Sequence, residues 1–171
     1  MTFSTCYSQP KELSIGFSPL GVATCDNITF KHVKGIQVGY KYRNKKKEKD
    51  KFIELTYYHC SLEDINSDDE YYGYCEEYND VDLSLYTILT INKGRRFQIP
   101  FYYGWGIGYW KGGTVENVSF HFPVKLRVQY YVSNRMALYV GTTAKLSIGL
   151  ENFGEQFDSR LSGDIGFLYN F

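Results

Sequence analysis

Hydrophobic residues recur at every second position along most of this chain. In the clearest segment, 97–109, the alternating positions are Phe97, Ile99, Phe101, Tyr103, Trp105, Ile107 and Tyr109. A period of two is typical of a β-strand whose two faces meet different surroundings. The same alternation occurs in segments 12–20, 35–43, 53–57, 81–91, 118–130, 136–148 and 161–171. No segment has the period of an amphipathic helix, so we predict an all-β chain with eight strands.

The positions between the hydrophobic residues form a polar face on these predicted strands. The charged members of this face are Glu12, Lys41, Arg43, Glu54, Asp82, Lys125, Arg127, Lys145, Arg160 and Asp164. In a soluble lipocalin-like barrel this face would point outward to water, whereas in a membrane barrel it would line the lumen. The alternation alone does not distinguish these two arrangements.

Strand length and aromatic content favour the membrane arrangement. Segments 97–109, 118–130 and 136–148 are each about 13 residues long, which exceeds the usual five to six and suffices to cross a bilayer at a tilt. The seven large apolar side chains of 97–109 would overfill a small soluble barrel but suit a lipid-facing wall. We therefore predict an eight-stranded antiparallel up-and-down transmembrane β-barrel whose lumen holds the charged network. A soluble lipocalin-like barrel is the fold alternative.

The predicted connections provide a separate argument. They are residues 21–34, 44–50, 60–80, 92–95, 110–117, 133–135 and 151–159. After the first hairpin, shorter and longer connections alternate, as they do when one rim of a barrel faces the periplasm and the other faces the outside. An even number of strands then places both termini at the periplasmic rim.

Three stretches carry a family resemblance. They are FHFPVKLRVQYYVSNRMALYVGTTAKLSIGL, FQIPFYYGWGIGYW and the terminal IGFLYNF. These residues resemble the small outer-membrane β-barrel family, the eight-stranded OmpA-like or porin-like membrane domain of Gram-negative bacteria. The resemblance covers 9–171 and implies a single barrel domain in the outer membrane. It also implies that Phe167, Tyr169 and Phe171 form an assembly signal for the barrel-assembly machinery.

The first eight residues, MTFSTCYS, differ from the rest of the chain. Cys6 and Ser8 are small residues at positions −3 and −1 relative to Gln9, as at a signal-peptidase site. Residues 1–8 are therefore interpreted either as a signal-peptide remnant or as a disordered N-terminus.

Composition excludes several classes of function. The net charge is zero, from 19 basic and 19 acidic residues, so the overall charge does not indicate a nucleic-acid binder. There is no HExxH or paired CxxC spacing, and no helix follows GWGIG as a nucleotide-binding loop requires. We expect no metal and no cofactor, and a monomer whose partners are outer-membrane lipid or lipopolysaccharide. The alternating glycines of GWGIG are expected to leave room for large neighbours inside the barrel.

The second long connection, 60–80, is the distinctive surface feature. It contains eight acidic and no basic residues, and Cys60 and Cys75 bracket most of it. In an oxidising compartment the two cysteines can form a disulfide, and closing a loop of about 15 residues is worth roughly 3 kcal/mol. Its tyrosines Tyr71, Tyr72, Tyr74 and Tyr78 could recognise an extracellular ligand. The alternatives are a calcium site, although no EF-hand spacing is present, and a solvated acidic loop.

The sequence thus predicts a non-enzymatic barrel with a role in envelope structure or surface interaction. A narrow porin or transporter lined by the same charged network is one alternative. Another is a lipid-modifying barrel enzyme, because Ser119 and His121 share the lumen face two residues apart. The sequence shows no acid positioned to orient the His121 imidazole, so we expect His121 to be a hydrogen-bonding residue of the lumen.

Overall fold

The computed structural model describes residues 11–25, 28–44, 49–61, 77–94, 96–112, 115–150 and 157–171. These residues form nine β-strands: β1 (Glu12–Cys25), β2 (Ile28–Lys31), β3 (Lys34–Asn44), β4 (Lys49–Ser61), β5 (Glu77–Lys93), β6 (Phe97–Gly112), β7 (Val115–Tyr131), β8 (Met136–Gly149) and β9 (Phe157–Asn170). In this part of the chain there is no helix of the length and hydrophobicity needed to cross a membrane.

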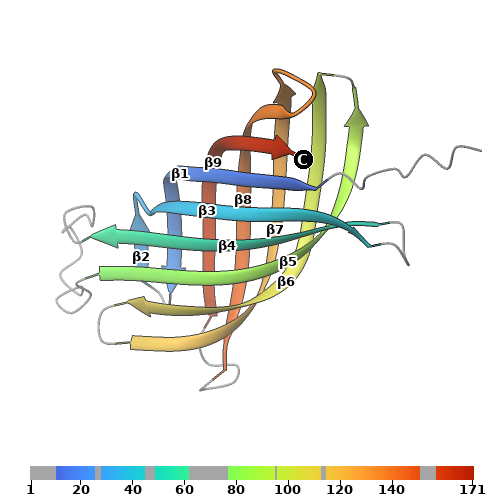
Figure 1. Cartoon of the computed structure of the whole chain (residues 1–171). Helices are drawn as coiled ribbons and strands as arrows, with labels where there is room; N and C mark the ends of the chain where they lie inside the picture. Colours follow the sequence, from blue (N-terminus) through green and yellow to red (C-terminus); the bar gives the residue numbers. More distant parts are fainter. Residues whose placement is uncertain are drawn as a thin grey trace, which may run out of the picture.

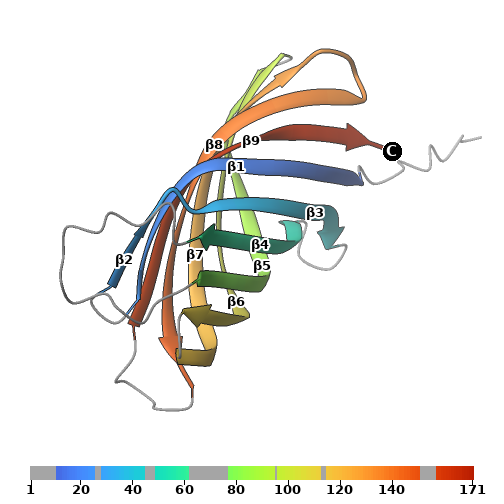
Figure 2. The same cartoon turned by 90° about the vertical axis from the view of Figure 1, so that its left-hand side faces the viewer.

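The strands form one antiparallel sheet that closes on itself (Figure 1). From β3 to β9 each strand pairs with the next in sequence, and β1 pairs with both β3 and β9. The view in Figure 2 shows β9 lying beside β1 at this closure. The predicted eight-stranded antiparallel barrel is confirmed, with β2 as an additional short strand.

The two ends of the barrel differ in their connections. At the end we call the terminus end, the N–H of Phe171 donates a hydrogen bond of 2.9 Å to the carbonyl of Lys11. The strand ends of β3 and β4, β5 and β6, and β7 and β8 meet at this end, and those of β1 and β2, β4 and β5, β6 and β7, and β8 and β9 meet at the opposite end, which we call the loop end. In the β7–β8 turn, Ser133 Oγ accepts hydrogen bonds from the N–H groups of Arg135 and Met136 at 3.3 and 3.1 Å.

β2 and β3 act as two halves of one barrel strand. Both run antiparallel to β1, with Lys31 opposite Val22 and Gly35 opposite Ser18. The break falls at His32, whose φ of 61° is uncommon for a residue other than glycine. The predicted connection 21–34 was therefore too long. Its polar residues end the hydrophobic alternation, but they leave the backbone free to continue the hydrogen-bonded ladder.

The strands also extend further at the loop end than the alternation predicted. β5 begins at Glu77, β6 ends at Gly112, β7 begins at Val115 and β9 begins at Phe157. The predicted connections 60–80, 110–117 and 151–159 thus include strand residues, and their boundaries were wrong. The reason is that a strand is held by backbone hydrogen bonds, which continue beyond the apolar region that produces the sequence signal.

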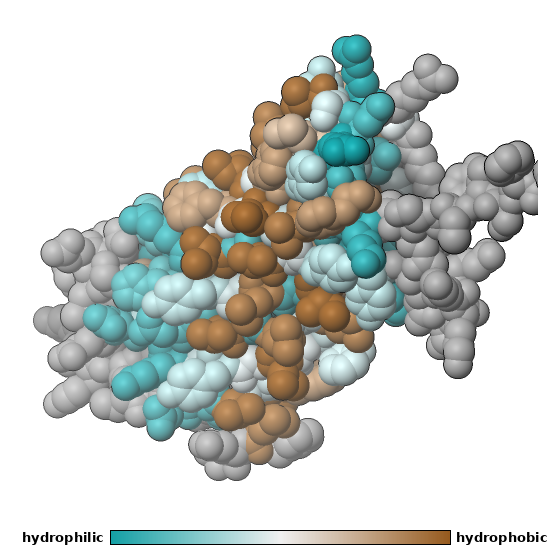
Figure 3. Space-filling view, in the orientation of Figure 1, coloured by the Kyte–Doolittle hydropathy of each residue, from teal (hydrophilic) through white to brown (hydrophobic). Residues whose placement is uncertain are grey.

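The outer face of the barrel is apolar and exposed. Leu20 is 63% exposed and Leu146 is 66% exposed, while Lys145 and Ser147 beside Leu146 face inward and are buried. Figure 3 shows the exposed hydrophobic residues as a band between two more hydrophilic zones. A continuous apolar band of this kind has the form of a lipid-facing wall.

Candidate functional site in the barrel lumen

The lumen contains most of the charged residues that the alternation assigned to it. Their side chains are at most 4% exposed: Glu12, Glu54, Asp82, Lys125, Arg127, Lys145, Arg160 and Asp164. Lys41 is 18% exposed and lies 3.9 Å from Glu12 and 3.5 Å from Asp50. The side chain of Arg43 lies outside the described part of the structure. Buried charges are costly unless they are paired and hydrogen-bonded, so the partners of each group determine what the lumen can do.

Glu54 is the centre of one ion-paired group, which we call the central cluster. Its Oε2 lies 2.5 Å from Lys125 Nζ, and its Oε1 accepts a hydrogen bond of 2.8 Å from Arg127 Nη2. The Oε1 of Gln37 accepts further hydrogen bonds from Lys125 at 2.6 Å and from Arg127 at 2.9 Å. Glu54, Lys125, Arg127 and Gln37 come from β4, β7 and β3, so the cluster spans the lumen.

Aromatic rings surround the Arg127 guanidinium. Its central carbon lies 4.1 Å from the ring centroid of Tyr139, 5.2 Å from that of Tyr102 and 5.3 Å from that of Phe52. A cation over an aromatic face gains electrostatic stabilisation, particularly where water is excluded. Arg127 therefore joins the charged central cluster to an aromatic layer at the terminus end.

Asp164 connects the central cluster to a group of hydroxyl residues. Its Oδ1 accepts hydrogen bonds from Ser18 at 2.6 Å and from Ser162 at 3.1 Å, and its Oδ2 accepts one from Thr143. Lys125 Nζ lies 3.9 Å from the same Oδ2. Because Asp164 has both a nearby cation and several donors, its carboxylate is well stabilised inside the barrel.

A second ion-paired group lies nearer the loop end, and we call it the loop-end cluster. It consists of Asp80, Asp82, Asp158, Lys145 and Arg160. Lys145 Nζ lies 2.6 Å from Asp80, 3.2 Å from Asp82 and 3.3 Å from Asp158. Arg160 donates to Asp80 and, at 2.9 Å, to Asp82.

Asp80 and Asp158 were not among the predicted lumen residues, because they lie in the predicted connections 60–80 and 151–159. Both are buried residues of β5 and β9. Each lies two residues from an assigned lumen residue, Asp82 or Arg160, so the same period of two could have found them. With them the loop-end cluster has three carboxylates against two cations. The Oδ1 atoms of Asp80 and Asp158 have no hydrogen-bond partner among the described residues.

Aromatic layers cover the charged groups on both sides. Toward the loop end, Phe30, Tyr58, Tyr78 and Trp110 pack with Ala23, Val33 and Cys60. Toward the terminus end, Phe52, Tyr86 and Tyr102 pack with Ile88. All these aromatic side chains are at most 1% exposed. Both ion-paired clusters thus lie between two layers of buried aromatic side chains.

The structure pairs His121 with Ser84 and not with Ser119, the serine two residues before it in the sequence. His121 Nε2 lies 2.9 Å from Ser84 Oγ on β5, whereas Ser119 Oγ has no hydrogen-bond partner in the described part of the chain. An acid also lies near the ring, because Asp82 Oδ1 is 3.4 Å from His121 Nδ1, although this contact is not a hydrogen bond. The sequence showed no acid positioned to orient the imidazole, whereas the fold brings Asp82 close to the ring without a hydrogen bond.

The glycines of β6 explain how His121 reaches Ser84. Gly106 lies between them in the sheet, opposite both Ser84 and His121. A Cβ at Gly106 would lie only 2.3 Å from His121 Nε2, and a Cβ at Gly108 only 2.2 Å from Asp82 Oδ1. The interpretation that these glycines leave room for large neighbours is confirmed. The absence of a side chain at Gly106 also explains why His121 pairs with Ser84. It lets the imidazole on β7 reach across β6 to the serine on β5.

The serine, histidine and aspartate have the composition of a hydrolytic triad but not its accessibility. Ser84, His121 and Asp82 are at most 3% exposed, and the Asp82 carboxylate is already paired with Lys145 and Arg160. A nucleophilic serine must contact its substrate. A metal site was also considered for the lumen. Within the described ranges, no group of three or more His, Cys, Asp or Glu side chains is arranged to hold a metal ion.

The acidic connection is described only at its two ends. Cys60 is buried, with Sγ 3.0 Å from the carbonyl oxygen of Lys31, while its predicted disulfide partner Cys75 lies outside the described residues. Tyr71, Tyr72 and Tyr74 also lie outside them. Tyr78 does not belong to an exposed recognition surface, because it is buried in the lumen and donates a hydrogen bond of 3.0 Å to Asp80.

The predicted assembly signal lies at the end of the closing strand. The buried Leu168 faces the lumen, whereas Phe167, Tyr169 and Phe171 are on the other, outward face of the strand. Phe171 is 62% exposed. The rings of Tyr169 and Phe171 are 5.1 Å apart. This arrangement continues the outer apolar face up to the last residue. The predicted N-terminal segment 1–8 lies outside the described residues.

Comparisons with known proteins agree with this architecture. No family model and no curated protein sequence matches the chain. Among solved structures, Neisserial surface protein A is similar with a TM-score of 0.66 and 12% identity over 95% of this chain and 97% of that chain. Ail, the attachment invasion locus protein of Yersinia pestis, has a TM-score of 0.60 and 13% identity over 96% and 99%.

The N-terminal β-barrel domain of Pseudomonas aeruginosa OprF is similar with a TM-score of 0.51 and 11% identity, over 96% of this chain and all of that one. At such low identity these likenesses bear on the fold rather than on activity. Together with the closed sheet and the exposed apolar wall, they show that this chain has the fold of the small eight-stranded outer-membrane β-barrels.

Proposed function

We propose that this protein is a non-enzymatic barrel of the Gram-negative outer membrane with a role in envelope structure or surface interaction. The observation that supports the proposal is the combination of an exposed apolar wall with buried ion pairs and aromatic rings inside the barrel. Such a wall requires lipid around it, and such a lumen leaves the loops as the surface that can meet a partner.

The membrane location is tested by extraction and gel mobility. We expect the protein to require detergent for extraction and to migrate faster unheated than boiled, because a closed barrel resists detergent until it is heated. A protein that stays soluble without detergent would instead support the lipocalin-like alternative.

The proposed orientation places the terminus end in the periplasm and the loop end outside. It is supported by the short β7–β8 turn beside the chain ends, since periplasmic turns are the shorter ones in such barrels. Cysteine-specific labelling of intact cells tests it. The background is a cysteine-free variant that carries Cys6→Ser, Cys25→Ser, Cys60→Ser and Cys75→Ser. In this background we expect a membrane-impermeant maleimide to label the variant Ser67→Cys but not the variant Asn134→Cys.

The chain between the end of β4 and the start of β5, within the acidic connection 60–80, is the proposed site for an extracellular ligand, with a disulfide between Cys60 and Cys75. The pairing of Cys60 with Tyr78 across β4 and β5 supports the disulfide, because Cys75 precedes Tyr78 by only three residues. Alkylation followed by mass spectrometry under non-reducing conditions tests it. We expect both thiols to be protected from alkylation until a reductant is added, and alkylation of both beforehand would contradict the disulfide.

A narrow porin is the second candidate, because the lumen charges could in principle line a conducting path. The direct ion pairs of Glu54 and Lys145 argue against it, since each salt bridge occupies space that a solvated ion would need. Planar-bilayer recording distinguishes the two. We expect no discrete conductance from the native monomer, and regular single-channel steps would favour the porin.

A further inference from the structure

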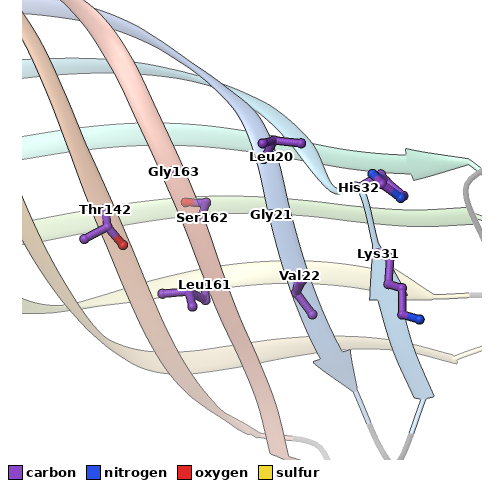
Figure 4. A pocket seen from close by; sticks show the side chains of 9 residues that line it. All are labelled: Leu20, Gly21, Val22, Lys31, His32, Thr142, Leu161, Ser162 and Gly163. Atoms are coloured by element: carbon purple, nitrogen blue, oxygen red, sulfur yellow. The ribbon is translucent and has the colours of Figure 1, made fainter.

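A shallow apolar groove opens on the outside of the barrel wall, separate from the lumen. It has a volume of about 450 Å³, within the range of small-ligand sites, and is lined by residues of β1, β2, β8 and β9 together with His32 (Figure 4). The lining side chains that matter for its chemistry are Leu20, Val22, Lys31, Thr142 and Leu161.

Two backbone irregularities produce the groove. Phe17 pairs with Ile165 and Leu20 pairs with Gly163, so Ser18 and Pro19 of β1 face a single residue of β9. This is a β-bulge, and proline suits it because a bulge needs no ladder N–H. On the other side of β1, the left-handed conformation of His32 interrupts β2 and β3. The regular wall is therefore broken on both sides of the same few residues of β1.

The floor of the groove is made of small residues. Gly163 faces outward, and a Cβ placed there would meet nothing closer than the carbonyl oxygen of Leu20 at 3.9 Å. Thr142 lies opposite Gly163 on the neighbouring strand β8. The larger Leu20 and Leu161 stand beside this floor and are 63% and 57% exposed. A shallow apolar groove of this kind offers an acyl chain more contact than a regular barrel wall does.

A basic pair lies at the edge of the groove. Lys31 and His32 are both exposed, and Lys31 stands opposite Val22 of the apolar wall. A lysine in this position can lie along apolar surface and carry its ammonium to the polar boundary of the membrane. Phosphate groups are found at that boundary, and basic side chains attract them.

We propose that this groove binds an anionic phospholipid of the surrounding leaflet, with one acyl chain over Gly163 and the phosphate, whose charge no cation of the same headgroup neutralises, at Lys31 and His32. The proposal rests on the membrane location proposed above. It goes beyond a general lipid-facing wall because it assigns one place on the barrel to one chemical class of lipid.

Native mass spectrometry of the full chain tests the proposal. The detergent-purified barrel is mixed with phosphatidylglycerol or with phosphatidylcholine of identical acyl chains, and retained lipid is counted. We expect several-fold greater retention of phosphatidylglycerol by the native chain. Lys31→Gln should reduce this preference to the level of phosphatidylcholine, and Gly163→Leu should reduce the retention of both lipids by filling the groove.

Two matched variants provide controls. Val81→Leu adds bulk to the outer wall away from the groove, and Lys51→Gln removes a wall lysine that instead bonds Thr87 at 2.7 Å. Both should retain lipid as the native chain does. Equal retention of the two lipids by the native barrel, or an unchanged preference in Lys31→Gln, would overturn the proposal.

Different outcomes contradict the lipid groove and the membrane location. A native chain that does not fold into detergent micelles contradicts the proposed function, whereas a folded barrel without lipid preference contradicts only the groove. If Gly163→Leu does not fold, the surface change Lys31→Gln still decides the question.

Discussion

Lys125 on β7 and Glu54 on β4 form an ion pair across the barrel, with Nζ and Oε2 2.5 Å apart and both side chains fully buried. β5 and β6 separate their strands in the sheet, so the pair joins walls that no backbone hydrogen bond connects. Arg127 shares the same carboxylate. One acid thus neutralises much of the positive charge in the centre of the lumen.

Replacing Glu54 with glutamine should strongly destabilise the barrel. The change leaves Lys125 and Arg127 buried with less compensating charge, and removing one partner of a buried pair typically costs about 3–5 kcal/mol. Urea unfolding of the protein in lipid vesicles measures the free energy directly. The double variant Glu54→Gln/Lys125→Met should recover part of the loss, because it also removes one uncompensated cation. An unchanged unfolding midpoint in Glu54→Gln would contradict the importance of the pair.

Two acids of the loop-end cluster should respond differently to the same substitution. Asp82 accepts a hydrogen bond from Arg160 at 2.9 Å and one from Lys145 at 3.2 Å, so Asp82→Asn should cost about 3–5 kcal/mol. Asp158 has longer contacts, 3.3 Å to Lys145 and 3.4 Å to Ser147, and belongs to the surplus of acids. Asp158→Asn should therefore cost much less. Equal losses in the two urea unfolding curves would show that the charge surplus has no effect.

Adding a methyl group should be harmful at one glycine and harmless at another. In Gly106→Ala the new Cβ would lie 2.3 Å from His121 Nε2 and 2.4 Å from the backbone oxygen of Leu83, a clash expected to cost about 1–3 kcal/mol. In Gly163→Ala the nearest atom is 3.9 Å away, so the change should be within about 0.5 kcal/mol. Samples of each variant are heated to a series of temperatures before a detergent gel is run. The temperature at which half of the protein loses its fast, folded mobility gives the unfolding midpoint of each variant. Similar midpoints would mean that the lumen adapts more freely than its packing indicates.

Removing His121 should reduce stability without altering lipids. His121→Ala leaves Ser84 without its 2.9 Å partner, and the loss of a buried hydrogen bond typically costs about 1–3 kcal/mol. Because the histidine is fully buried, no lipid reaches it, and the lipid profile of cells expressing the variant should match that of cells with the native protein. Ser84→Ala is the matched control. A lipid species that depends on both residues would instead support the barrel enzyme.

The sequence predicted the lumen face well wherever the apolar alternation was strong. Lys125 and Arg127 lie in such a segment, and their inward direction followed from the period of two. Asp80 and Asp158 lie just beyond it, where polar Asn79 and Ser159 interrupt the outward apolar series, so the alternation was weak although the strands continue. The uninterrupted ladder at these ends became visible only when the paired strands were known.

The sequence by itself determined the all-β class, the eight barrel strands and the separation of apolar and charged faces, because a strand's period of two is a local property of the backbone. Only the tertiary structure decided which charges pair, since Glu54 and Lys125 are brought together by barrel closure and not by spacing along the chain. The same holds for His121 with Ser84, which meet over a glycine, and for the groove at Gly163, which a bulge opens. Alternation specifies the direction of a side chain, whereas register and curvature select its partner.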